Sequence, residues 1–121
     1  MTEIKSYRDP QVWQRAIDFA INLYGVTDSF PKTEDYGLTG QMRRAVVSIA
    51  SNIAEGHKRP GREFGRFIGI ALGSLAKFET QLEIPNRIGY IAPEDFASLE
   101  GELLVIGKQL NVLYQHLKQT G

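Results

Sequence analysis

Apolar residues recur every three or four positions along most of the chain, a spacing that places them on one face of an α-helix. The longest series lies toward the C-terminus and consists of Phe96, Leu99, Leu103, Ile106, Leu110, Leu113 and Leu117. A second series alternates in the same way and consists of Phe64, Ile68, Ala71, Leu75, Phe78 and Leu82. Both patterns are typical of helices that pack along a shared core.

The sequence predicts four such helices, at about residues 9–25, 38–55, 60–88 and from 93 onwards. Asp9 is a good N-cap residue, and Pro10 suits the first helical position because its missing N–H would be unpaired there anyway. Gly56 is a natural stop for the second helix. Pro85 is expected to kink or shorten the third helix, because its ring removes a hydrogen bond and crowds a carbonyl. No stretch shows a strand pattern, so we expect an all-α fold, an up-down-up-down antiparallel four-helix bundle.

Three glycines stand four residues apart inside the third predicted helix: Gly65, Gly69 and Gly73. Each costs up to about 1 kcal/mol relative to alanine in a helix interior. Such a cost indicates close approach of another backbone, either within the bundle or between two copies of the chain.

Aromatic residues at helical apolar positions are expected in the core, with Phe67 also a candidate subunit contact. The connection between the first two helices, residues 27–36, contains Phe30 and Tyr36. We expect both rings to pack against the bundle, because exposed aromatic side chains in a loop would be an unneeded cost.

Composition narrows the class of protein. The chain has 121 residues, is 42% hydrophobic and contains no cysteine. It can therefore bury one core, so we expect residues 1–121 to form a single domain without disulfides or thiolate metal sites. His57 and His116 are far apart, and we expect no metal and no other cofactor. No apolar run approaches the roughly 20 residues that span a bilayer, so we expect a cytoplasmic protein without a membrane partner.

Positive charge is concentrated in the stretch 41–66. The chain as a whole has 14 basic and 14 acidic residues, whereas this stretch contains only two acids, Glu55 and Glu63. Cations on one surface can neutralise the phosphates of a nucleic acid. The candidate nucleic-acid-binding residues are Arg43, Arg44, Lys58, Arg59, Arg62 and Arg66. The alternative is that these residues form a solvated face, or pair with the acids between Glu94 and Glu102 of a neighbouring subunit.

A polar stripe follows the second helix beside its apolar face and contains Gln41, Arg44, Ser48, Asn52 and Glu55. No histidine or paired acid stands at catalytic spacing, and a serine without a base is not a nucleophile. We therefore expect a structural polar seam rather than an active site. Ser48 and Asn52 should form hydrogen bonds across a helix interface or to the connection that carries Glu34, and Glu55 should pair with Arg44 or Arg59.

The same stretch carries a recognisable motif, Q-x-RRA-xx-SI-x-SNIAEG at residues 41–56, supported by IALGSL at residues 70–75. In these residues the chain resembles the small bacterial proteins first described as encoded by intervening sequences within 23S rRNA genes. The resemblance implies a four-helix bundle that assembles as a ring of five protomers. A related branch comprises accessory proteins of diversity-generating retroelements, which associate with a reverse transcriptase and nucleic acid.

Together these features predict a non-enzymatic, homo-oligomeric helical bundle that serves as a scaffold or accessory protein for a nucleic-acid-containing complex. Its expected partners are further copies of itself, RNA or DNA, and a reverse transcriptase or another protein. The alternative is a structural assembly protein that binds a protein partner and no nucleic acid.

Overall fold

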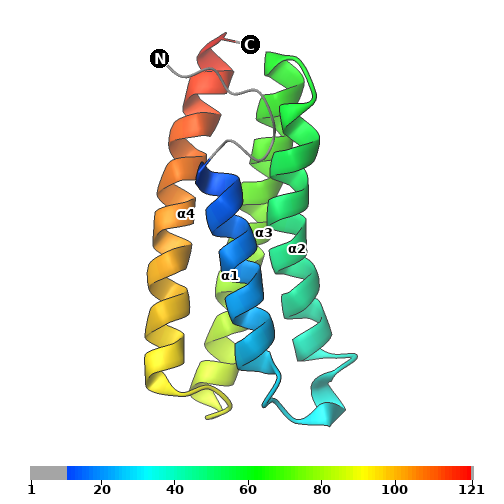
Figure 1. Cartoon of the computed structure of the whole chain (residues 1–121), viewed down its shortest axis with the longest axis vertical. Coiled ribbons are helices and arrows are strands. Elements are labelled where there is room, and N and C mark those ends of the chain that lie inside the picture. Colours follow the sequence, from blue (N-terminus) through cyan, green and yellow to red (C-terminus); the bar gives the residue numbers. More distant parts are fainter. Residues whose placement is uncertain (1–10, 121) are drawn as a thin grey trace.

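A computed structural model of the chain describes residues 11–120. It has four α-helices: α1 (Gln11–Thr27), α2 (Leu38–His57), α3 (Gly61–Arg87) and α4 (Pro93–Thr120). A short 3-10 turn, η1 (Lys32–Glu34), lies between α1 and α2. Consecutive helices run antiparallel side by side, and α4 packs against α1 (Figure 1). Residues 11–120 contain no strand, so the predicted all-α four-helix bundle is confirmed. The predicted cap at Asp9 and Pro10 lies outside the described residues.

The apolar series read from the sequence form the core. All six members of the α3 series are buried, as are Leu99, Leu103, Ile106, Leu110 and Leu117 of α4. Phe96 and Leu113 are half-buried against this core. At its centre the rings of Phe19 and Phe78 meet edge to face, with centroids 5.2 Å apart. Such a pair contributes about 0.5–1.5 kcal/mol beyond the area it buries.

Gly56 does not end α2, which continues to His57. A Cβ atom added to Gly56 would lie 2.6 Å from Cβ of Phe67 and 3.2 Å from the carbonyl oxygen of Phe64. The glycine is therefore needed because α2 and α3 approach closely there. Within residues 11–120, the one residue with a positive φ angle is Gly89 (83°), in the turn between α3 and α4.

Pro85 lies inside α3, is fully buried and does not end the helix early. The helix continues to Arg87, one residue short of the predicted end. The Pro85 carbonyl accepts a hydrogen bond from the Tyr90 N–H at 2.9 Å, which ties the following turn to the helix end. Pro85 has no N–H for the Gln81 carbonyl, but the last turn of α3 is still closed by the hydrogen bond from the Ile88 N–H to the Ile84 carbonyl at 3.1 Å.

The two aromatic residues of the first connection behave differently. Phe30 is buried, and its ring lies 5.6 Å from that of Tyr90, as predicted. Tyr36 is 99% exposed, so the prediction that it packs on the bundle is wrong. Successive hydrogen bonds from Asp35 N–H to Lys32 O and from Gly37 N–H to Glu34 O wind this segment into a tight coil, and Tyr36 lies on its outer side.

The row of glycines in α3 faces α4 over only part of its length. A Cβ atom at Gly65 would lie 3.5 Å from Cβ of Leu117, and one at Gly69 would lie 3.3 Å from the ring of Tyr114. One at Gly73 would meet nothing within 4 Å. The close approach is thus made by side chains of α4 at the first two glycines, while Gly73 lies on an open face.

Candidate nucleic-acid interface

The six basic residues predicted to contact nucleic acid lie in two places along the bundle. Lys58, Arg59, Arg62 and Arg66 surround the turn between α2 and α3, at the top of Figure 1. Arg43 and Arg44 lie near the start of α2. Fifteen residues separate Arg43 from Lys58, which corresponds to about 22 Å along a helix. The two groups therefore do not form one continuous patch.

Ion pairs at the α2–α3 turn neutralise its charge only in part. Arg59 pairs with Glu55 at 2.9 Å, and Arg66 pairs with Glu63 at 3.2 Å. All four side chains are about half exposed, and pairs of this kind are worth roughly 0–1 kcal/mol. Arg62 is exposed and forms no ion pair with any residue in the described range 11–120. Polyanions can therefore compete for these guanidinium groups.

Phe67 holds two of the arginines in place. Its half-buried ring lies on α3. The guanidinium carbon of Arg59 lies 5.4 Å from the ring centroid, and the guanidinium carbon of Arg66 lies 4.9 Å from it. Cation–π contacts of this kind contribute about 0.5–1 kcal/mol at exposed sites. The contacts orient both guanidinium groups before any ligand arrives. The sequence assigned Phe67 only to the core or to a subunit contact.

A cleft of about 420 Å³ between α3 and α4 extends the same basic surface. Arg62 and Arg66 line it from α3, and Tyr114 and Lys118 line it from α4. Tyr114 and Lys118 were not among the residues predicted from the sequence, and they lie about 50 residues away along the chain. In an up-down bundle, however, the end of the last helix lies beside the start of the third. The predicted topology alone could therefore have placed these two residues near Arg62 and Arg66. We call Lys58, Arg59, Arg62, Arg66 and Lys118 the basic end.

Arg43 is engaged within the fold. Its Nε donates to Oγ1 of Thr27 at 3.0 Å, and its guanidinium also donates to the carbonyl oxygen of Tyr24 at 3.3 Å. The same group lies 4.6 Å from the centroid of the Tyr24 ring. Because the last carbonyls of a helix have no partner inside it, these contacts cap the C-terminal end of α1.

In the polar seam, Asn52 bonds within α2 and Ser48 bonds across to α3. Asn52 donates to the carbonyl oxygen of Ser48 at 2.8 Å and to its hydroxyl at 3.1 Å. The Ser48 hydroxyl in turn lies 2.9 Å from the hydroxyl of Ser74, across the interface between α2 and α3. Glu55 pairs with Arg59 and not with Arg44. Gln41 and Arg44 instead line a groove between α2 and α3.

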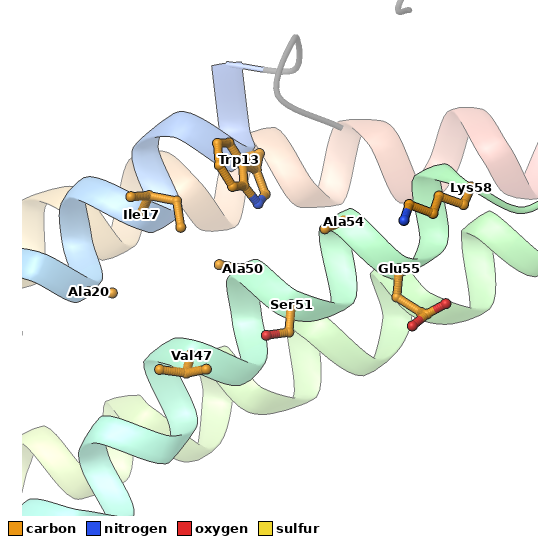
Figure 2. Close-up of a pocket in the computed structure, with 9 residues that line it drawn as sticks. All are labelled: Trp13, Ile17, Ala20, Val47, Ala50, Ser51, Ala54, Glu55 and Lys58. Atoms are coloured by element: carbon orange, nitrogen blue, oxygen red, sulfur yellow. The ribbon is translucent and has the colours of Figure 1, made fainter. Parts of the chain in front are cut away.

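An apolar groove of about 410 Å³ runs between α1 and α2 on another face. Trp13 and Ile17 project from α1 toward Ala50 and Ala54 of α2 (Figure 2). The small side chains of α2 leave room between the helices, and Val47 at the edge of the groove is exposed. Apolar surface of this kind is typical of a contact with another chain.

Neither histidine belongs to a cluster of metal-binding side chains within residues 11–120. His57 packs edge-on against Phe64, with ring centroids 5.6 Å apart. No group of three potential metal ligands occurs among the residues that the structure describes. Over the same residues, every helix is too short or too polar to cross a bilayer.

Comparison with known proteins places this bundle in a family. The model of the 23S rRNA-intervening sequence protein family matches residues 8–112. The chain also resembles a crystal structure from Bacteroides thetaiotaomicron VPI-5482, described as a protein with unknown function from the S23 ribosomal protein family. That likeness has a TM-score of 0.78 and 24% identity, and covers 86% of this chain and 95% of the other, which supports the fold alone. A search of curated proteins found no match. The family match extends over most of the four-helix bundle, and the chain therefore belongs to the 23S rRNA-intervening sequence protein family.

Proposed function

We propose that this protein is a non-enzymatic, homo-oligomeric accessory or scaffold protein that binds nucleic acid through its basic end. The observation that carries the proposal is the segregation of charge along the bundle. The basic end has five cations against two carboxylates, Glu55 and Glu63, a net charge of +3 in a chain whose total is zero. The acids that begin α4, Glu94 and Asp95, lie at the opposite end (Figure 1).

The chemistry of the basic end suits a flexible polyanion. Exposed guanidinium groups can bind phosphates in pairs of parallel hydrogen bonds. Arginine planes and aromatic rings also stack on bases of single-stranded nucleic acid, and Phe67 and Tyr114 stand beside the arginines. The binding mode we expect is sequence-tolerant, because backbone phosphates carry no sequence information.

Assembly of several protomers would strengthen this binding. A closed ring repeats the basic end around its axis, so that a modest charge per protomer becomes a strong local potential. The apolar groove between α1 and α2 and the open face at Gly73 support a contact between copies. Further support comes from Leu104 and Val112 of α4, which are 62% and 72% exposed on one face. We propose that the oligomer is a ring of five protomers, as the family resemblance implies. We also propose that the protein acts in the cytoplasm.

A second candidate function is a structural assembly protein that binds a protein partner and no nucleic acid. It is favoured by the pairs Arg59–Glu55 and Arg66–Glu63, since arginines paired within the chain are less available to phosphates. In the first candidate role the protein partner is a nucleic-acid enzyme, such as a reverse transcriptase.

Charge reversal at the basic end separates the two candidates. We would measure binding of short RNA and DNA by fluorescence anisotropy at low salt, for the natural chain and for Arg62→Glu combined with Arg66→Glu. A matched control is Arg87→Glu, an exposed arginine at the far end of α3 that also pairs within its own helix, with Glu83. The proposal predicts that the double variant loses binding and the control retains most of it. Undetectable binding by the intact natural oligomer, verified by light scattering, would favour the assembly protein.

A further inference from the structure

The groove between α2 and α3 is a second polar site, separate from the basic end. It has a volume of about 520 Å³ and is lined by Gln41, Arg44, Ala45, Ser48, Ser74, Lys77 and Gln81. No carboxylate is among these residues. The groove therefore presents hydrogen-bond donors and positive charge to whatever enters it.

The lining residues form three matched layers. The hydroxyls of Ser48 and Ser74 meet at 2.9 Å. Because α2 and α3 are antiparallel, Arg44, four residues before Ser48, lies level with Lys77, three residues after Ser74. Each is about one helical turn from the serine pair. One turn further in the same direction, Gln41 lies level with Gln81. A hydroxyl pair, a cation pair and an amide pair thus follow one another along the groove.

Within residues 11–120 the cation layer has no carboxylate partner. Arg44 and Lys77 form no ion pair with any residue in the described part of the chain, and they line the groove from α2 and α3 respectively. Like charges in apposition repel each other, and the repulsion is relieved when an anion lies between them. The pair is therefore arranged as the two sides of an anion site.

Gln81 is a buried amide in the groove whose oxygen has no partner among the described residues. Its side chain lines the groove but is only 8% exposed, and its Oε1 atom is buried without a hydrogen-bond partner. Buried polar groups are almost always satisfied, so an unsatisfied one needs an explanation. No donor bonds to Oε1 and fixes the amide as it stands, so turning the amide over, which leaves its shape unchanged, would present its N–H donors to an anion in the groove.

We propose that this groove binds a phosphate dianion, either as the free ion or as the phosphomonoester group of a larger molecule. Two cations match the charge of a phosphomonoester, which is about −1.5 to −2 at pH 7. A phosphodiester inside a strand carries one negative charge, and a carboxylate offers fewer oxygens than the serine hydroxyls, amides and cations can engage. A phosphorylated small molecule and the 5′-phosphate at the end of a nucleic-acid strand share this chemistry.

The test is a titration of the ¹⁵N-labelled full-length protein with inorganic phosphate, followed by NMR at constant ionic strength and pH 7.5. We expect saturable shifts of the amides around Ser48, Ser74 and Lys77. Arg44→Gln and Lys77→Gln should each weaken binding by about tenfold or more, since a charge-assisted hydrogen bond is lost. The exposed Arg87 provides the control, and Arg87→Gln should leave the affinity within about twofold.

Protonation of the ligand gives a second readout. The second pKa of inorganic phosphate lies near neutrality, so its affinity for the groove should fall between pH 7.5 and pH 5 as the dianion becomes a monoanion. Sulfate remains a dianion over this range and should keep its affinity. Absence of saturable shifts in the groove, or equal weakening by Arg87→Gln and Lys77→Gln, would overturn the proposal.

The two sources of the phosphate are distinguished in the Arg62→Glu, Arg66→Glu background, where the basic end no longer contributes. A preference for a 5′-phosphorylated over a 5′-hydroxyl oligonucleotide, abolished by Lys77→Gln, would identify the strand end. Binding of inorganic phosphate without such a preference would identify a small phosphorylated molecule. Either result supports the groove, and neither depends on nucleic-acid binding at the basic end.

Discussion

Replacing Gly56 by alanine tests the close approach of α2 and α3 at this residue. The added methyl carbon would lie 2.6 Å from Cβ of Phe67 and 3.2 Å from the backbone oxygen of Phe64. Favourable contacts between carbon atoms lie at about 3.5–4.0 Å. A Cβ atom and a carbonyl oxygen cannot move by a change of rotamer, so α2 and α3 must shift apart by roughly 1 Å.

The expected magnitude follows from two opposing effects. Overpacking at a fixed contact costs about 1–3 kcal/mol. Replacing glycine by alanine in a helix returns up to about 1 kcal/mol, and less at a helix end. The net result is destabilisation by about 1–2 kcal/mol, which corresponds to a fall in Tm of roughly 3–12 °C for a domain of this size.

Thermal unfolding followed by circular dichroism at a single protein concentration measures this change, because Tm depends on concentration if the chain assembles. Gly101→Ala is the matched control, since Gly101 lies inside α4 and an added Cβ would meet nothing within 4 Å. We expect the control to raise Tm. A Gly56→Ala variant at least as stable as the natural chain would refute the close packing of α2 on α3.

Three further substitutions test individual contacts. Arg43→Ala removes the cap of α1 and should lower the free energy of unfolding by about 1–2 kcal/mol, measured by urea denaturation. It should reduce nucleic-acid affinity far less than Arg62→Gln does. A large loss of affinity with unchanged stability would instead place Arg43 in the nucleic-acid interface. Gln81→Met keeps the side-chain volume and removes the unpaired buried oxygen, so it should raise the free energy of unfolding by about 1 kcal/mol; a loss of stability would mean that Oε1 has a partner. Ser74→Ala breaks the hydrogen bond to Ser48 and should cost about 0.5–1.5 kcal/mol, with a similar coupling energy in a double-mutant cycle; zero coupling would argue against that bond in solution.

The fold followed from the sequence because burial of apolar faces decides it. The series in α3 and α4 repeat at helical spacing without a break, and only a bundle hides several such faces at once. Residue-level rules were less reliable where tertiary packing competes with them. Gly56 has the local properties of a helix stop, yet its position is set by Phe67 on the neighbouring helix.

The site was less predictable because neighbouring residues on a helix point in different directions. Arg43 and Arg44 are adjacent in sequence but about 100° apart around α2. Arg43 therefore caps α1. Arg44 lines the groove between α2 and α3, as Lys77 does from α3. Tyr114 and Lys118 join the basic end only through the packing of α4 on α3, and nothing in their local sequence marks them.

The salt dependence of nucleic-acid affinity tests the central claim most directly. For single strands, the logarithm of the binding constant falls with the logarithm of salt concentration with a slope of about −0.7 for each phosphate neutralised. Replacing Arg62 and Arg66 by glutamine removes two such contacts per protomer that engages the strand. Our account predicts a steep slope for the natural chain and one shallower by about 1.4 per engaged protomer in the double variant. A slope near zero for the natural chain, or the same slope for both proteins, would contradict it.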